Sequence, residues 1–189
     1  MILFIHGFAG SSSSTKGQIL KEYFKEKAAV LVPDVPEEPE KAFSLLIDKI
    51  KSSKDEKNLI IGSSLGGFYA LMLLSKFKDI STVLINPALY PYEQLKSYIG
   101  EKITRNNGTI FEWKEKYIEQ LKKIKEESDK NINLKNILLL LSTDDELIDY
   151  KETINILGET GKTIVLDNAG HEFSRFEEVL NDIENFYGI

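Results

Sequence analysis

The chain has 189 residues, of which 42% are hydrophobic and 29% are charged, and its formal net charge is -6. This size and balance are typical of one soluble globular domain, and the acidic excess argues against a nucleic-acid partner, whose phosphates require basic residues. The chain contains no cysteine, which excludes disulfides, thiolate catalysis and zinc–sulfur sites.

Residues 1–5 are apolar, but they are too few for a secretory signal and no basic leader accompanies them. Elsewhere no apolar run approaches the roughly 20 residues that a membrane span needs. We therefore expect a cytoplasmic protein with no membrane partner.

Strands and helices alternate along the first half of the chain. Short apolar runs predict strands at residues 2–5, 28–32, 59–61 and 82–85. Apolar residues at helical spacing predict three helices between them, one that contains Leu20 and Phe24, one that begins at Pro39 and one that begins at Leu65. This alternation with short connections is typical of a parallel sheet covered by helices.

The second half of the chain interrupts this alternation once and then resumes it. Residues 89–131 contain a turn at 106–108 and then an amphipathic helix that carries Tyr117 and Leu121. Strands follow at residues 137–141 and 163–166, and a final helix is predicted to bury apolar residues from Phe173 to Phe186 at helical spacing. The sequence thus predicts a single α/β domain over residues 1–189, with a parallel sheet of about six strands and helices on both faces.

The insertion at residues 89–131 leaves the predicted sheet directly after Pro87. From this position we expect it to arch over Ser64 as a short helical cap. The alternative is that its helix packs on a face of the sheet, away from any site.

The segment Gly62-Ser63-Ser64-Leu65-Gly66 joins a predicted strand to a predicted helix and fits the G-x-S-x-G pattern of a nucleophile elbow. Ser64 has glycine two residues before and two residues after it, where side chains would collide with the strand and the helix. The helix that begins at Leu65 also directs its free N–H groups toward the serine oxygen. The sequence therefore predicts Ser64 as a nucleophile, and the alternative is a glycine-rich turn with no chemical role.

A serine nucleophile needs a base within hydrogen-bonding reach, and the chain contains two histidines. His171 follows the last predicted strand, at the sheet edge where parallel strands place ligand sites. An acid that orients this base should follow another strand. Four acidic residues follow the strand at 137–141, namely Asp144, Asp145, Glu146 and Asp149. The order serine, acid, histidine is that of α/β-hydrolases.

The chain resembles the α/β-hydrolase superfamily, and in particular the small YqiA-type esterases, over nearly its whole length. The matching segments are His6-Gly7-Phe8 with the serines and Lys16 that follow, residues 62–67, Asn86-Pro87-Ala88, residues 145–150, and Gly170-His171 with Phe173 and Phe176.

The resemblance implies roles for residues that the pattern alone leaves open. It places the acid at Asp145, which precedes one residue and two aliphatics, whereas Asp144 stands where relatives often carry glycine. It also implies an oxyanion hole formed by the N–H groups of Phe8 and Leu65. In such enzymes His6 orders the loop that contains Gly7, and Gly62 and Gly66 complete the elbow motif.

These observations predict a serine hydrolase that cleaves carboxylic esters or thioesters of small to medium acyl groups through an acyl-enzyme. Ser64 attacks, His171 accepts and returns the proton, and Asp145 orients His171. No metal or organic cofactor is implied, and the predicted partner is a small-molecule acyl ester or thioester. The alternatives are an amidase or peptidase with the same triad, or a non-catalytic hydrolase-like binding protein. The sequence specifies no oligomeric state.

Overall fold

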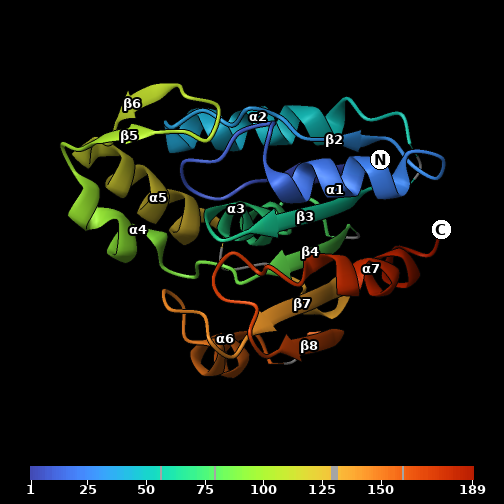
Figure 1. Ribbon diagram of the computed structural model, residues 1–189. Helices are drawn as coiled ribbons and strands as arrows, with labels where there is room; N and C mark the ends of the chain where they lie inside the picture. The colour runs from blue at the N-terminus through green and yellow to red at the C-terminus, as the bar shows by residue number, and fades with distance from the viewer. Residues whose placement is uncertain (56, 79, 129–131, 159) are drawn as a thin grey trace.

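Parallel strands form a six-stranded main sheet in the computed structural model, which describes residues 1–55, 57–78, 80–128, 132–158 and 160–189 (Figure 1). Their order across the sheet is β2 (Val30–Leu31), β1 (Ile2–Ile5), β3 (Leu59–Ser63), β4 (Ser81–Ile85), β7 (Ile137–Ser142) and β8 (Lys162–Leu166). The chain leaves β1 toward β2 and returns on the other side of β1 as β3. In open parallel sheets such a reversal leaves a crevice at the carboxyl ends of the two strands, where ligands bind.

Alternate residues of β1 show how the sheet is buried on both faces. Leu3 and Ile5 belong to one apolar cluster, and Ile2 and Phe4 belong to another. Helices α2 (Pro39–Lys51), α3 (Leu65–Leu73), α5 (Glu115–Ser128) and α6 (Tyr150–Leu157) complete the first cluster, and α1 (Thr15–Phe24) and α7 (Leu180–Tyr187) complete the second. The predicted α/β class, with a parallel sheet of about six strands and helices on both faces, is confirmed.

Two predicted elements differ from the structure at their ends. The strand expected at residues 28–32 is reduced to the two residues of β2, which lies at the edge of the sheet and is only partly buried. The final helix does not begin at Phe173, which lies in a turn with a φ of 48°. The 3-10 helix η4 (Phe176–Val179) precedes α7 instead. Phe173 fits the helical spacing because its side chain packs in the same core as α7.

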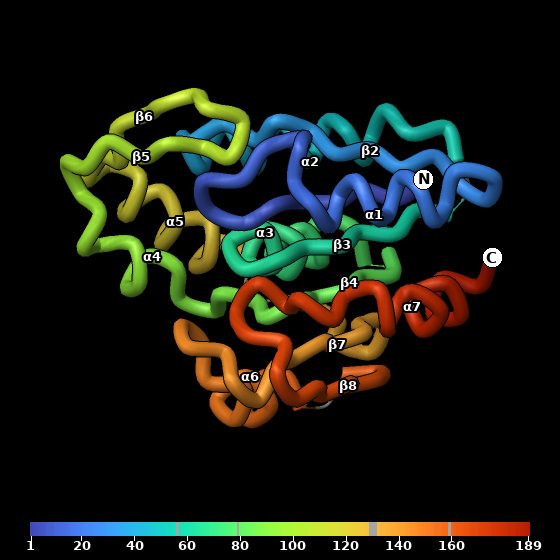
Figure 2. The backbone as a smooth tube through the Cα atoms, viewed as in Figure 1, coloured from blue at the N-terminus to red at the C-terminus, as the bar shows by residue number. Residues whose placement is uncertain are grey.

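Residues 89–128 lie at the end of the sheet toward which the strands point, on the left in Figures 1 and 2. After β4 come α4 (Pro91–Gln94), the 3-10 helix η1 (Leu95–Tyr98), the hairpin of β5 (Lys102–Thr104) and β6 (Ile110–Glu112), and α5. The predicted turn at 106–108 connects β5 and β6. The sequence indicated the turn but neither of these two strands. The predicted end of the insertion, Asn131, is outside the described residues.

In the part of the chain that the structure describes, no helix combines the length and the apolar character needed to span a membrane.

Candidate active site

Ser64 lies between the end of β3 and the start of α3 in a strained backbone conformation, with φ 54° and ψ -118°. A Cβ added at Gly62 would collide with the carbonyl of Gly66, and a Cβ at Gly66 would collide with the carbonyl of Ile5 on β1. The elbow therefore requires glycine at both positions, as expected from the spacing. The turn raises the Ser64 side chain above the carboxyl edge of the sheet.

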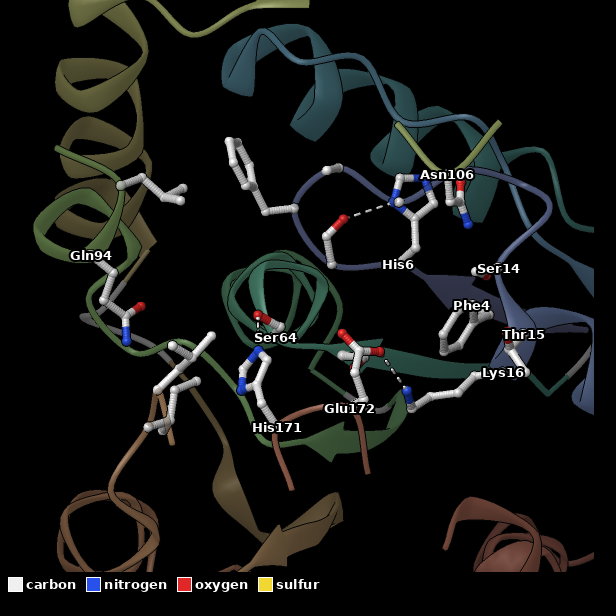
Figure 3. Close-up of a pocket in the computed structure, with 18 of the residues that line it drawn as sticks. Phe4, His6, Ser14, Thr15, Lys16, Ser64, Gln94, Asn106, His171 and Glu172 are labelled. Carbon is white, nitrogen blue, oxygen red and sulfur yellow. Dashed lines mark hydrogen bonds and ion pairs between the residues drawn. The ribbon is translucent and has the colours of Figure 1, made fainter. Parts of the chain in front are cut away.

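The Ser64 hydroxyl is the first member of a chain of three side chains, of which Figure 3 shows Ser64 and His171. Ser64 Oγ lies 2.9 Å from His171 Nε2, and His171 Nδ1 lies 2.9 Å from Asp145 Oδ2. Since a carboxylate can only accept hydrogen bonds, Nδ1 carries a proton and its N–H donates a hydrogen bond to Asp145. Nε2 is then the unprotonated nitrogen and accepts a hydrogen bond from the Ser64 hydroxyl, which is the tautomer that a general base requires.

Backbone amides hold the Asp145 carboxylate in place. The N–H groups of Leu147 and Ile148 donate to its Oδ1 at 2.8 and 2.9 Å. The Asp145 side chain is 1% exposed, and that of His171 is 10% exposed. The acid is therefore shielded from solvent and fixed in orientation, while the imidazole remains accessible from the cavity.

The neighbouring acid, Asp144, has a different set of partners. It accepts hydrogen bonds from Ser142 Oγ at 2.6 Å and from the N–H groups of Ala169 and Gly170 at 3.1 and 3.2 Å. The Ser142 hydroxyl and then these amides hold the pKa of the Asp144 carboxyl below its usual value. Asp144 thus ties the loop after β8 to the end of β7, and Asp145 reaches the imidazole.

Asn86 also fixes the loop after β8 that carries His171, and the sequence indicated no role for it. It follows β4 with a φ of 39° and is 1% exposed. Its Oδ1 accepts from the N–H of Ser142 at 3.0 Å, and its Nδ2 donates to the carbonyls of Gly170 and His171 at 3.0 and 3.1 Å. The signal in the sequence was an asparagine directly after a buried strand, since asparagine tolerates a positive φ better than most residues.

His6 lies at the carboxyl end of β1 and has backbone partners on both ring nitrogens. Nδ1 lies 3.0 Å from the carbonyl of Gly7, and Nε2 accepts from the N–H of Val35 at 3.3 Å. Burial lowers the pKa of His6, so the neutral form is favoured with its proton on Nδ1. The ring also packs against Gly10, where a Cβ would approach Nδ1 to 2.7 Å. These contacts fix the loop that carries Phe8 beside Ser64.

The β5–β6 hairpin holds the same loop from the other side. Arg105 Nη1 donates to the carbonyl of Gly10 at 3.0 Å, and the N–H of Asn106 donates to the carbonyl of Ala9 at 3.1 Å. The Phe8 ring packs edge-on against Trp113, with 5.0 Å between ring centroids. The insertion is therefore joined to the loop next to the serine by hydrogen bonds and by aromatic packing.

Comparison with known proteins adds to this geometry. A model of UPF0227, described as an uncharacterised protein family, matches residues 1–188. This chain belongs to the UPF0227 family. A UPF0227 protein of Pectobacterium atrosepticum is 28% identical over 193 residues, which cover 98% of each chain. A UPF0227 protein of Yersinia pseudotuberculosis is 28% identical over 190 residues, again with 98% of each chain covered.

Solved structures similar to this UPF0227 chain are more distant in sequence. Est1E from Butyrivibrio proteoclasticus has a TM-score of 0.70 at 16% identity, over 98% of this chain and 85% of that one. The monoacylglycerol lipase of Paleococcus ferrophilus has a TM-score of 0.71 at 17% identity, over 98% of this chain and 93% of that one. These likenesses confirm the predicted α/β-hydrolase fold.

Ser64 and His171 of the UPF0227 chain line a cavity of about 680 Å³ at the reversal between β1 and β3. One wall comes from the loops after β1 and β3 and from the start of α1. The insertion contributes the other wall through Gln94, Leu95, Tyr98 and Asn106, and the loop after β7 contributes Leu147 and Ile148. Among the residues that the structure describes, no three His, Asp or Glu side chains gather closely enough to hold a metal ion.

Proposed function

We propose that this protein is a serine hydrolase that cleaves carboxylic esters or thioesters of small to medium acyl groups through an acyl-enzyme. The observation that carries this proposal is the continuous hydrogen-bonded chain from Asp145 through His171 to Ser64, with contacts of 2.9 Å at each step, which ends in a cavity. Nucleophilic catalysis uses a buried carboxylate, an imidazole in the base tautomer and a strained serine together. Without such a role, the buried charge and the strained backbone would only lower the stability of the fold.

The reaction proceeds in two halves. Ser64 Oγ attacks the carbonyl carbon as its proton moves to His171 Nε2, and Asp145 stabilises the imidazolium that forms. The N–H groups of Phe8 and Leu65 are assigned to the oxyanion, a contribution of about 3 kcal/mol per donor in acyl-transfer enzymes. His171 then gives the proton to the departing alcohol or thiol. Water then attacks the acyl carbon while His171 Nε2 takes a proton from it. His171 returns this proton to Ser64 Oγ as the carboxylic acid leaves.

The size and walls of the cavity support a small-molecule acyl substrate. A volume of about 680 Å³ lies in the range of small-molecule sites. We assign the insertion after β4 the role of a short cap, because Gln94, Leu95 and Tyr98 line the same cavity as Ser64. Among proteins of this fold, Est1E has been solved with ferulic acid bound, and the Paleococcus ferrophilus protein is named a monoacylglycerol lipase. An ester substrate is therefore the first to test.

The test is turnover of p-nitrophenyl butyrate by the wild type and by Ser64→Ala and Ser63→Ala. Ser63 is the matched control, because it is the adjacent serine, at the end of β3, and also lines the cavity. Ser64→Ala should lower kcat by about 10⁶-fold, while Ser63→Ala should keep most of the activity. A folded wild type without turnover on any ester or thioester would favour the non-catalytic binding protein.

A further inference from the structure

Lys16 is a largely buried cation in the wall of the cavity that holds Ser64. It is the second residue of α1, its side chain is 12% exposed, and it lines the cavity beside Ser14 and Thr15. Burial lowers the pKa of the Lys16 ammonium. A cation in such a position is costly unless an anion lies close to it.

Glu172, with which Lys16 forms an ion pair, is a weak partner. Glu172 Oε2 lies 3.6 Å from Lys16 Nζ, and the Glu172 side chain is 91% exposed. Ion pairs with an exposed partner contribute little, because water and side-chain entropy compete with them. Glu172 can turn into solvent at low cost, and the ammonium is then available to an anion of a bound molecule.

The start of α1 also favours a negative charge at this end of the cavity. Its first turn contains no acidic residue, and the N-cap residue Ser14 forms no side-chain cap. Within the described part of the chain, the buried Ser14 Oγ has no hydrogen-bond partner. The positive end of the helix dipole and an unused hydroxyl donor therefore lie in the same wall of the cavity as Lys16.

We infer that the α1 end of the cavity binds a carboxylate or phosphate group carried by the ester whose carbonyl reacts at Ser64. This inference rests on the proposed function and adds a substrate class to it, namely acyl esters with a remote negative charge. In Figure 3, Glu172 lies between Lys16 and the pair of Ser64 and His171. The anion of the substrate takes the place of the Glu172 carboxylate beside Lys16. It is thus remote from the reacting carbonyl, on which the oxyanion forms.

The experiment compares matched esters that differ in one negative charge. On the acyl side, the p-nitrophenyl monoester of adipic acid is compared with its methyl-capped diester. On the alcohol side, the butyryl ester of glycerol phosphate is compared with glycerol monobutyrate. The wild type should prefer the charged member of one pair by about 10- to 100-fold in kcat/KM. The pair that shows the preference tells which side of the ester carries the anion.

Three variants then assign the preference to Lys16. Lys16→Met removes the charge at similar length and should bring the ratio between charged and uncharged esters close to one, whereas Lys16→Arg should retain most of it. Lys21→Met is the control, because Lys21 is exposed on the same helix. Thermal unfolding of each variant is measured in parallel.

Two results would overturn the inference while the proposed function stands. One is a wild type that hydrolyses the uncharged esters yet prefers neither charged member. The other is a Lys16→Met variant that loses activity equally on both members of a pair, which would make Lys16 a structural residue. By contrast, an enzyme that hydrolyses none of the four esters and is not labelled at Ser64 by a fluorophosphonate would overturn the proposed function as well.

Discussion

The two histidine loops of this protein lie at the same edge of the sheet and line the same cavity, yet they give their histidines opposite surroundings. In the loop after β1, His6 has a backbone carbonyl on one ring nitrogen and a backbone amide on the other. In the loop after β8, His171 has a buried carboxylate on one nitrogen and the Ser64 hydroxyl on the other. The first ring holds a loop in place, and the second has the partners of the general base that we propose.

The partners of a histidine therefore decide its chemistry more than its position in the fold does. A ring with both nitrogens engaged by backbone groups has no free nitrogen for a substrate proton. A ring held by an acid at Nδ1 has its Nε2 lone pair directed at a hydroxyl, and the acid stabilises the charged form when it appears. The predictions that follow separate these two roles.

Replacing His171 should have the largest effect. His171→Ala removes the base and should lower kcat/KM for p-nitrophenyl butyrate by about 10⁶-fold. The circular dichroism spectrum and melting temperature should change little, because the loop is also held by Asn86 and Asp144. A variant that keeps most of its activity would contradict the assignment of His171 as the base.

Replacing the acid should have the next largest effect. Asp145→Asn leaves the shape of the site intact but can stabilise the wrong tautomer of His171, and should lower kcat by about 10⁴-fold. The measurement is steady-state turnover with the same ester as for His171→Ala.

Asp144→Asn is the matched control for Asp145→Asn and should lower kcat by less than about tenfold, because Asp144 does not contact the imidazole. Its effect should be on stability. The pKa of Asp144 is lowered in the folded state, so its contribution is present above the unfolded pKa of about 3.8 and is lost as the pH falls below it. Thermal unfolding from pH 2.5 to 6 should show a shallower acid decline in Asp144→Asn than in the wild type. A larger loss of turnover in Asp144→Asn than in Asp145→Asn would exchange the two roles.

Replacing His6 should have a smaller effect on catalysis and a clear one on stability. His6→Gln cannot keep both backbone hydrogen bonds, and should lower the free energy of unfolding by about 1–3 kcal/mol and kcat by about tenfold. Burial lowers the pKa of His6, so the wild type should lose stability as the pH falls below about 6.5, where the unfolded histidine binds a proton more readily. Urea unfolding from pH 5 to 8 should show less of this loss in His6→Gln. An equal pH dependence in both proteins would show that His6 is not held neutral by the fold.

Replacing Tyr98, an aromatic residue in the cavity wall that the insertion contributes, should have the smallest effect. Tyr98 lines the cavity, whereas Tyr90 lines an adjoining depression but not the cavity itself, and is the matched control. Tyr98→Ala should shift the preferred acyl length and change kcat/KM for individual p-nitrophenyl esters by roughly three- to tenfold. Tyr90→Ala should keep the wild-type profile. Identical profiles for all three proteins would remove the cap from the proposed mechanism.

Much of the fold could be predicted because its signals are local. The strands β1, β3, β4 and β7 are apolar runs buried on both faces, and the glycine spacing around Ser64 reflects collisions within a single turn. The hairpin of β5 and β6 gave no such signal, because its three-residue strands are mostly exposed and have no apolar run.

The sequence-based prediction of the site rested on one rule, that the loops after parallel strands meet at the same edge of the sheet. That rule brought Ser64, His171 and a group of acids together but did not rank the acids by their partners. Asn86 connects the ends of β4 and β7 with the histidine loop through hydrogen bonds between residues distant in sequence. Lys16 lies near the start of a helix, and its burial depends on packing against residues distant along the chain.

The most direct test of the central claim is to map the site of covalent labelling by a fluorophosphonate. The purified protein is incubated with the probe, digested and analysed by mass spectrometry, with His171→Ala and His6→Gln treated in parallel. We expect an adduct on Ser64 in the wild type, a slower but complete adduct in His6→Gln, and almost none in His171→Ala. An adduct on Ser63 or elsewhere, or equal labelling of the wild type and His171→Ala, would contradict that claim.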